Sequence, residues 1–363
     1  MEMKTLSSTI DFHWKQPDVS LEKYVRKRRI QLGVEVASKY KIYLDLRFWI
    51  LFREVELGRN HNQDLIKLLY QIKCLVDKGS AICPISETVF VELMKQSDRE
   101  TRFATAKLID RLSSGVTLIV NPERISQELC NAIYSQAGAK NLIPIDELVW
   151  TKLSYIFGES HPYQTLFDPS EELVIQKSFF DHMWGITLTE MMGYLDFEGW
   201  DQPDWQKTAD GLNSGSKEHA DIVRSYEQTY RIEFEGGLSL FKEQLMQLFK
   251  DVENAGYNEF EANSKSLSNK ERFRKFSKSV RTLHISACCH AAVRWDQKRQ
   301  LTGNDLLDFH HAEAALGYCN LFLTERPLKI LVSQNHLGLK NDFPCAIESS
   351  AADGLRVLNA KKA

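Results

Sequence analysis

Four acidic side chains lie beside apolar segments of this sequence, where a metal site would gather its ligands. They are Asp45, Glu92, Asp308 and Glu325. An ionised carboxylate in an apolar segment is costly to bury unless it is paired or binds a cation. Mg²⁺ and Mn²⁺ prefer oxygen ligands, commonly one or two carboxylates together with waters and a substrate phosphate. Such an ion would activate water and orient a scissile phosphate, so phosphodiester hydrolysis would need no nucleophilic side chain.

Three of these acids have a definite place in the predicted elements. Asp45 interrupts an apolar run that is typical of a buried strand. Glu92 lies on a largely apolar helix that Ser86 can cap. We predict that Asp308 opens a later helix, although Asp305 is an alternative cap for the same helix.

The order of these residues resembles the PIN-like nuclease domain. Members of that family share a strand-borne Asp, a helix-borne Glu after a Ser, a later Asp that opens a helix, and a Thr that ends a strand beside an acid. The matching positions are Asp45, Glu92, Asp308 and the pair Thr324–Glu325. The resemblance covers residues 38–125 and 280–335. It implies an α/β three-layer fold with a central parallel sheet, and a Mg²⁺- or Mn²⁺-dependent endoribonuclease.

The resemblance also implies a role for each acid. Asp45 and Asp308 would bind the metal directly. Glu92 would bind the metal or its water, and Glu325 would be an outer ligand or a ligand of a second metal. The accessory positions are Asp305, Asn320 and Thr324.

The sequence departs from the family pattern at three points. Leu46-Arg47 stands where relatives usually have Thr-Asn after the first Asp. Asn320 stands where many relatives have an Asp before the last strand, and Glu325 where they usually have an Asp. A neutral amide can still hold a metal-bound water. The departures motivate an alternative function, a catalytically weak PIN-like scaffold that binds RNA or a protein.

Each acid has a structural alternative as well. Asp45 could be a strand-end carboxylate solvated by loops, and Glu92 a partly exposed helical Glu. Asp308 could be a helix N-terminal charge, worth only ~0.3–1 kcal/mol. If the acids do not converge, the chain would be an unrelated helical regulator.

Histidine and cysteine side chains supply further groups. His310 and His311 are adjacent on a predicted helix and cannot share a face, so we expect one to pack and the other to approach phosphate. His284, Cys288 and His290 are close enough in sequence to suggest zinc. Their number and spacing do not match a zinc pattern, so core packing is the favoured interpretation.

Composition sets the outer limits. The chain has 363 residues, 43% of them hydrophobic, enough for one large domain or two ordinary ones. Lys and Arg number 46 against 49 Asp and Glu, a net charge of −3, so phosphate binding would need local basic patches. Seven Cys without a C-x-x-C pair are typical of reduced thiols. No run approaches membrane-spanning length and the N-terminus lacks a secretory pattern, so we expect a soluble, cytoplasmic protein without membrane contact.

Two basic segments could supply those patches, 24–29 and 270–281. The second holds the expected nucleic-acid-binding cations Arg272, Arg274, Lys275, Lys278 and Arg281. Phe273 and Phe276 alternate with these cations. They could stack on the bases of a single strand, or form the buried face of an amphipathic helix.

Strand and helix signals alternate in the first third of the chain. The predicted elements are a strand at 41–45, helices at 47–56, 62–77, 86–96 and 100–113, a buried strand at 115–120, and a helix that begins at Asn121-Pro122. This order predicts an α/β fold with a parallel central sheet. The region 122–250 is predicted to be mostly helical, with an exposed loop at 199–216. A core or dimer surface is favoured over a substrate platform for a group of its Trp and Met residues, which are Trp184, Trp200, Trp205, Met183, Met191 and Met192.

We predict five segments along the chain. They are an N-terminal helical and basic extension (1–37), the first part of the PIN-like domain (38–125), a helical insertion (126–280), the second part of the domain (281–335) and a C-terminal tail (336–363). RNA is the expected substrate because the resemblance implies it. The family's use in toxins and defence suggests growth arrest or anti-phage cleavage. An antitoxin or sensor protein is an expected regulator, and a homo-oligomer is compatible with the sequence.

Overall fold

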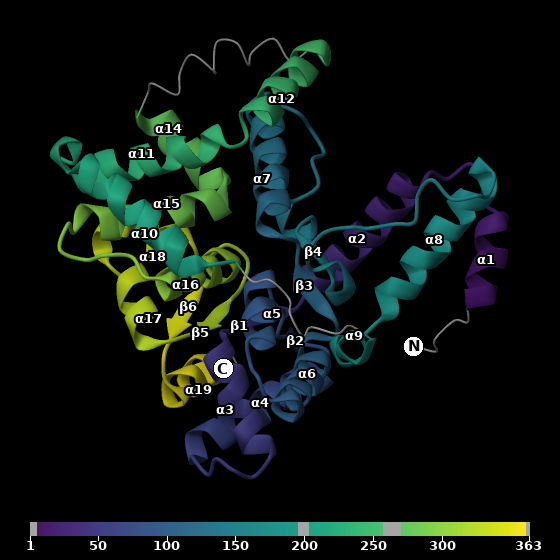
Figure 1. Ribbon diagram of the computed structural model, residues 1–363, viewed down its shortest axis with the longest axis horizontal. Coiled ribbons are helices and arrows are strands. Elements are labelled where there is room, and N and C mark those ends of the chain that lie inside the picture. Colours follow the sequence, from purple (N-terminus) through teal and green to yellow (C-terminus); the bar gives the residue numbers. More distant parts are fainter. Residues whose placement is uncertain (1–5, 195–202, 257–269, 361–363) are drawn as a thin grey trace. The chain divides into compact units, whose positions relative to one another are not determined.

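The computed structural model describes residues 6–194, 203–256 and 270–360 (Figure 1). Most of these residues are helical, and short strands form a small parallel sheet and an antiparallel pair. The predicted mixed α/β class is confirmed, whereas the three-layer PIN-like arrangement stays a prediction. The chain divides into two compact units. Unit 1 consists of the described residues of 1–40, 72–120 and 146–199, and unit 2 of those of 41–71, 121–145 and 200–363.

Three short parallel strands carry the sheet of unit 2. They are β1 (Tyr40–Leu44), β5 (Leu321–Leu323) and β6 (Ala346–Glu348). β5 lies between the other two, because Leu323 pairs with Leu44 on one side and with Glu348 on the other. The side chains of β5 are fully buried. Strands buried on both faces have near-continuous apolar sequences, which explains why β1 and β5 were predictable.

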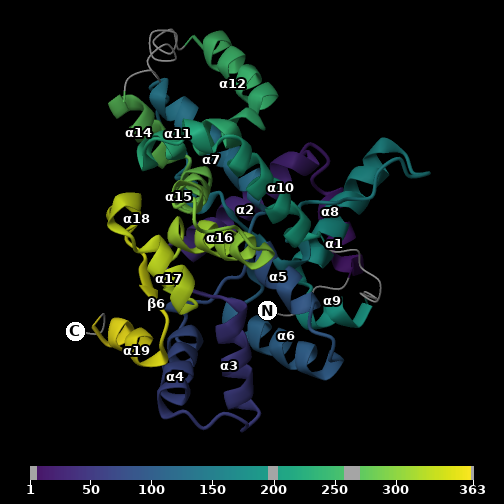
Figure 2. The ribbon, with the colours of Figure 1, turned by 60° about the vertical axis from the view of Figure 1, so that its left-hand side comes forward.

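Helices pack against the buried side chains of this sheet. α16 (Gly303–Leu316) contacts β5, α17 (Arg326–Val332) contacts β6, and α19 (Ala351–Ala360) contacts both strands (Figure 2). α3 (Leu46–Glu56) follows β1 directly, and α4 (Gln63–Asp77) comes next in the chain. Both helices match the predicted ranges 47–56 and 62–77 within one residue.

A second apolar core in unit 2 lies between helices. These helices are α7 (Asn121–Gln136), α11 (Tyr226–Ser239), α12 (Lys242–Asn254), α14 (Lys270–Ser279) and α15 (Arg281–Trp295). Phe234 and Phe276 are buried in this core, and Phe273 packs against it. The amphipathic interpretation of Phe273 and Phe276 is therefore confirmed.

The predicted loop at 199–216 is wrong for most of its length. Residues 205–216 belong to α10 (Trp205–Glu218), whose first turn is capped by Asp204, and residues 199–202 lie outside the described part of the chain. α10 packs on α16 through Gly303, where an added Cβ would lie 2.9 Å from the Gln206 nitrogen. This contact between distant segments stabilises a helix whose own sequence is polar and glycine-rich.

Unit 1 is mostly helical. Its helices are α1 (Leu6–Trp14), α2 (Leu21–Ala37), α5 (Glu87–Met94), α6 (Arg99–Ser113), α8 (Pro169–Gly185) and α9 (Leu188–Tyr194). Its strands are β2 (Ala81–Ile82), β3 (Val116–Leu118) and β4 (Trp150–Lys152). The predicted strand at 115–120 is confirmed as β3, but its expected place in a parallel sheet is wrong, because β3 pairs antiparallel with β4. Trp184, Met191 and Met192 are buried, as the core interpretation predicted. Met183 and Trp205 are half-buried, and Trp200 lies outside the described part of the chain.

Short helical turns complete both units. They are η1 (Ile145–Glu147), η2 (Leu153–Tyr155), η3 (Ala220–Ile222), η4 (Asn335–Leu337) and α18 (Leu339–Asp342). η4 and α18 follow α17 in unit 2, and both take part in the polar contacts described below.

Candidate functional site

Asp45 occupies the point where β1 ends and α3 begins. Its side chain accepts a hydrogen bond from the Phe48 backbone nitrogen at 3.1 Å, so it is the N-cap of α3. Its own backbone nitrogen donates to the Leu323 oxygen of β5 at 3.1 Å. Only 5% of the residue is exposed. Asp45 is therefore a buried carboxylate at the carboxyl end of a parallel strand, the edge where open α/β sheets bind their ligands.

Burial raises the pKa of Asp45 from 3.8 to about 6. His311, the Phe48 N–H group and the Thr324 hydroxyl counteract this rise in pKa, and the charge of Glu325 adds to it. At a pH near 6, the Asp45 carboxyl is thus a mixture of its protonated and ionised forms. A cation that took the proton's place would relieve the cost of burying the negative charge.

The parallel register brings Thr324 and Glu325 beside Asp45. Leu44 pairs with Leu323, so the next residue of each strand lies at the same edge. The Thr324 hydroxyl oxygen is buried and makes no hydrogen bond of ordinary geometry, although it lies close enough to Asp45 to lower the pKa of that carboxyl. Glu325 is exposed and stands at the start of α17, where its side chain makes no capping hydrogen bond.

α16 adds a histidine to this group. The buried His311 contacts the Tyr43 hydroxyl through Nδ1 at 2.9 Å and lies near enough to Asp45 to lower its pKa. Asp308 is half-buried and precedes His311 by three residues, so the two share one face of α16. His310 instead pairs with Glu313 at 2.9 Å. The two histidines point to different faces, as the sequence predicted.

The expectation that Asp308 opens its helix is wrong. α16 begins at Gly303, and Thr302 is its N-cap. The side chain of Asp305 accepts a hydrogen bond from the Thr302 nitrogen at 2.8 Å, which completes a capping box. The alternative prediction that Asp305 is the cap is also wrong, because Asp305 is the third residue of the helix and Thr302 is the cap, and Asp308 lies in the second turn.

Glu92 and Asn320 complete the set of residues predicted for the site. Glu92 is half-buried on α5 and belongs to unit 1, whereas Asp45 belongs to unit 2. Asn320 precedes β5, and its side-chain oxygen accepts a hydrogen bond from the Lys41 nitrogen at 2.9 Å. Four residues of extended chain separate Asn320 from Thr324, roughly 13 Å along the strand. The amide of Asn320 therefore joins the starts of β1 and β5, at the opposite edge from Asp45.

A divalent cation fits the Asp45 group only as a sparsely ligated ion. Among the described residues, no group of three or more His, Cys, Asp or Glu side chains is arranged to hold a metal ion. Mg²⁺ commonly uses only one or two carboxylates, with waters and substrate phosphate as its other ligands. Asp45 and Glu325 meet that smaller requirement, and the Thr324 hydroxyl is a buried oxygen without an ordinary hydrogen-bond partner.

No protein-family model, curated protein or solved structure matches this chain. The resemblance to PIN-like nucleases accordingly depends on the motifs of the sequence alone. Within the described residues, no helix combines the length and the apolar character needed to cross a membrane.

The cations of the basic segment at 270–281 differ in exposure. Arg272, Arg274 and Lys275 are exposed on α14. Lys278 forms an ion pair with Asp342 of α18. The remaining cation, Arg281, donates to the Gly317 oxygen at 2.8 Å and lies over the Tyr318 ring. The first three are thus better placed than the last two to contact a nucleic acid.

The other basic segment, 24–29, lies in unit 1 and makes several structural contacts. The Tyr24 hydroxyl donates to Asp181 at 2.7 Å, and Arg29 pairs with Glu159 at 3.0 Å. Arg28 lies over the ring of Trp184. These contacts give the segment a role in packing α2 against α8.

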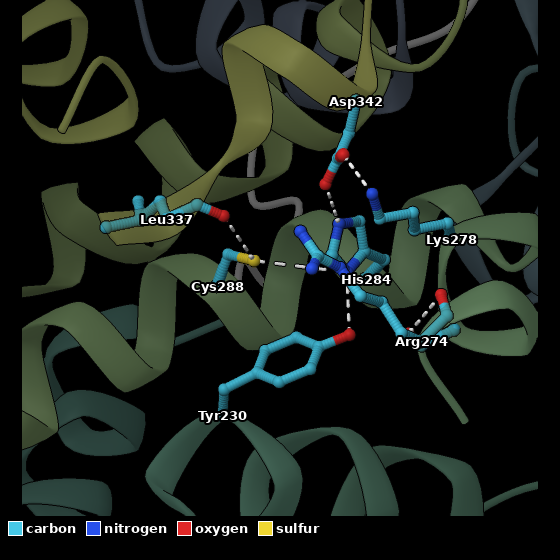
Figure 3. A network of polar contacts seen from close by, with 8 residues as sticks. Tyr230, Arg274, Lys278, His284, Cys288, Leu337 and Asp342 are labelled. Carbon is cyan, nitrogen blue, oxygen red and sulfur yellow. Dashed lines mark hydrogen bonds and ion pairs between the residues drawn. The ribbon is translucent and has the colours of Figure 1, made fainter. Parts of the chain in front are cut away.

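His284 and Cys288 belong to a buried polar network in unit 2 that the sequence did not predict (Figure 3). His284 lies between the Tyr230 hydroxyl, 2.7 Å from Nδ1, and Asp342, 3.1 Å from Nε2. Cys288 Sγ lies 3.9 Å from the same Nδ1, and Asp342 also pairs with Lys278. Although burial alone would lower the pKa of His284, Cys288 and Asp342 raise it to about 9.

This network, defined as Tyr230, Lys278, His284, Cys288 and Asp342, joins four helices. They are α11, α14, α15 and α18. Both ring nitrogens of His284 are engaged, and Cys288 is almost wholly buried. His290 packs its ring against Phe309, and burial lowers its pKa. The favoured interpretation of these residues as core packing agrees with this structure. The role of Asp342 was not predictable from the sequence, because this residue lies in α18, a short turn after Gly338.

Proposed function

We propose that the chain is a Mg²⁺- or Mn²⁺-dependent endoribonuclease that hydrolyses phosphodiester bonds at the carboxyl ends of β1 and β5. The observation that carries the proposal is Asp45, a buried carboxylate with a pKa of about 6 beside Thr324 and Glu325. A buried carboxyl with a perturbed pKa at a ligand-binding edge of a sheet is a candidate for a functional group.

Asp45 and Glu325 would hold the cation, and Asp308 would reach it from α16 or through a water. When bound, the cation would polarise the phosphate and lower the pKa of a water. Asp45 would hold the cation as a carboxylate and would give its proton to solvent, because a bound cation would neutralise its charge instead. Phe48 N–H holds the carboxylate of Asp45 in one orientation through the N-cap hydrogen bond. Thr324 provides a hydroxyl that can donate to Asp45 or to a bound water.

RNA is the proposed substrate because the resemblance implies it, and the exposed cations of α14 support binding to phosphates. Arg272, Arg274 and Lys275 are all exposed there. We place the activity in the cytoplasm, in growth arrest or anti-phage defence, under the control of an antitoxin or sensor protein.

A catalytically weak RNA- or protein-binding scaffold is the second candidate. Two observations favour it. The side chain of Asp45 already serves as the N-cap of α3, and the amide of Asn320 is committed to Lys41. In such a protein, Asp45 would position β1 and α3 and would not contact a substrate.

The test compares wild type with the Asp45→Asn variant, because Asn keeps the ability to cap a helix while losing the negative charge. Purified proteins are incubated with labelled tRNA, single-stranded RNA and single-stranded DNA, with Mn²⁺ or with EDTA. We expect wild type to cleave RNA only with Mn²⁺, and the variant to fall to the level seen with EDTA. The matched control is Glu218→Gln, an exposed acid on α10, which should cleave like wild type.

The outcomes separate the two candidates. Metal-dependent cleavage that Asp45→Asn abolishes supports the nuclease. Absence of cleavage by wild type, with RNA still bound, rejects the nuclease and favours the scaffold. Equal cleavage by wild type and Asp45→Asn would remove Asp45 from the site.

A further inference from the structure

Unit 2 contains a pocket that is not lined by any of the four acids predicted to form the metal site. Its volume is about 490 Å³, within the range of small-molecule sites. The end of α15, the segment that follows it, α17 and η4 form its walls. Its polar and aromatic lining residues are Trp295, Asp296, Gln297, Lys298, Arg299, Gln334 and His336.

The aromatic wall of the pocket is held in place by ring contacts. Trp295 is 44% exposed, which is high for an indole. Its ring lies 5.3 Å from that of His336, and the Tyr226 ring lies 4.7 Å from His336 and 6.2 Å from Trp295. All three contacts are edge-to-face. An exposed ring that is fixed by two neighbours is a ready surface on which a planar base can stack.

Cations and amides line the rest of the pocket. Lys298 is exposed, and Arg299 is held by an ion pair with Asp305. Asp296 is the acid of the lining and Asp305 pairs with Arg299, so the two cations face two carboxylates while still presenting N–H donors to a phosphate. Gln334 brings an amide with both donors and an acceptor, and the amide nitrogen of Gln297 donates to the Ala220 oxygen at 3.2 Å while its oxygen can still accept.

We propose that this pocket binds one nucleotide of a single-stranded RNA, with the base stacked on Trp295 and the phosphate near Lys298 and Arg299. A nucleotide uses every feature of the lining: a planar base for the rings, base edges for the amides and a phosphate for the cations. An acidic peptide would use the cations alone. The choice of RNA rests on the proposed function, whereas the recognition of a nucleotide rests on the pocket itself.

The pocket and Asp45 are related through α16. Arg299 lies just before the start of α16 at Gly303, and His311 of the same helix influences the pKa of Asp45. Gly303 and His311 are separated by roughly 12 Å along the helix axis. A strand with one base in the pocket could therefore follow α16 toward Asp45, so the pocket would select where along the strand the Asp45 site acts.

The test measures binding in EDTA, where the proposed cleavage cannot occur. Two probes are used, the mononucleotides AMP and UMP, and short single-stranded oligo(A) and oligo(U). We expect Trp295→Ala to weaken binding about tenfold or more, the loss typical of one stacked base. Trp295→Phe should retain most of the affinity, because it keeps a ring. Lys298→Glu should weaken binding and lower the slope of affinity against salt concentration by at least about 1.

The matched control is Trp14→Ala in unit 1, which removes an indole that is 47% exposed. It should bind like wild type. Circular dichroism of each variant shows whether it has folded, and Lys298→Glu tests the pocket even if Trp295→Ala does not fold. Binding of mononucleotides and oligonucleotides supports a nucleotide pocket, and binding of oligonucleotides alone supports a site for an RNA strand. Affinities that neither Trp295→Ala nor Lys298→Glu changes would overturn the proposal.

This result is independent of the cleavage test. If cleavage is absent but binding depends on Trp295, the pocket remains and the nuclease is rejected. If cleavage depends on Asp45 but neither Trp295→Ala nor Lys298→Glu changes the binding affinity, the nuclease remains and the pocket is rejected.

Discussion

Two buried charged groups in unit 2 differ in how completely their polar atoms are satisfied. In the network of Tyr230, Lys278, His284, Cys288 and Asp342, both nitrogens of His284 and both oxygens of Asp342 have partners (Figure 3). At the end of β1, the carboxylate of Asp45 accepts a hydrogen bond from the Phe48 backbone nitrogen. The hydroxyl of the neighbouring Thr324 makes no hydrogen bond of ordinary geometry.

The difference shows in the two pKa values. Partners raise the pKa of His284 to about 9 despite burial, so the ring keeps its charge. Burial raises the pKa of Asp45 to about 6, so this carboxyl keeps its charge poorly. A satisfied group stabilises the fold, whereas an incompletely satisfied one can still gain a ligand. We therefore assign the His284 network to stability and the Asp45 group to function.

The largest effect is expected from Asp342→Ala. Its carboxylate is almost wholly buried between His284 and Lys278, so its removal leaves a buried charge unpaired. We expect a loss of about 3–5 kcal/mol in the free energy of unfolding, measured by urea denaturation. The control is Glu235→Ala, which removes an exposed partner of Arg231 and should leave stability unchanged. A loss as small as that of the control would contradict the structural role.

At neutral pH, Asp45→Asn should raise the free energy of unfolding, whereas Asp342→Ala should lower it. The folded pKa of about 6 exceeds the ordinary 3.8, so the folded state binds more protons than the unfolded state between these values. The contribution of Asp45 to stability is then full below pH 4 and falls by about 3 kcal/mol as pH rises through the folded pKa of about 6.

The measurement is the unfolding free energy of wild type and Asp45→Asn at several pH values. Asn carries no charge to desolvate, so the variant should gain on wild type as pH rises from 4 to 7. The same Glu218→Gln control should follow wild type throughout. A difference that does not change with pH would mean that the carboxyl is not destabilised by burial, and the comparison with His284 would lose its basis.

Local patterns were enough to predict many elements of this fold. β1, α3, α4, α6 and β3 occur where apolar periodicity and helix-start residues indicated them. The start of α16 was missed because the hydroxyl of Thr302, and neither of the two acids, caps the helix, while Asp305 completes the capping box. α10 was missed because its support comes from Gly303, far along the chain.

The candidate site was only partly predictable for the same reason. Asp45, Thr324 and Glu325 were selected from sequence, and their proximity follows from the parallel pairing of β1 with β5. Tyr43 was missed because an aromatic residue in a buried strand looks like ordinary core. Its hydroxyl contact with His311 depends on the packing of α16, which no local pattern encodes. The segment boundaries predicted for the PIN-like parts stay predictions.

The smallest and sharpest test removes one hydroxyl from each group. Tyr230→Phe deletes the hydroxyl partner of His284 Nδ1, which leaves this buried nitrogen only the weakly hydrogen-bonding Cys288 Sγ and should cost about 1–2 kcal/mol. Thr324→Val deletes an oxygen that has no ordinary hydrogen bond, so the free energy of unfolding at pH 4, where Asp45 is protonated, should change by less than about 0.5 kcal/mol. Both values come from urea denaturation under the same conditions. Equal losses would mean that the Thr324 hydroxyl is as fully engaged as that of Tyr230, and the Asp45 group would then have no spare oxygen to offer a ligand.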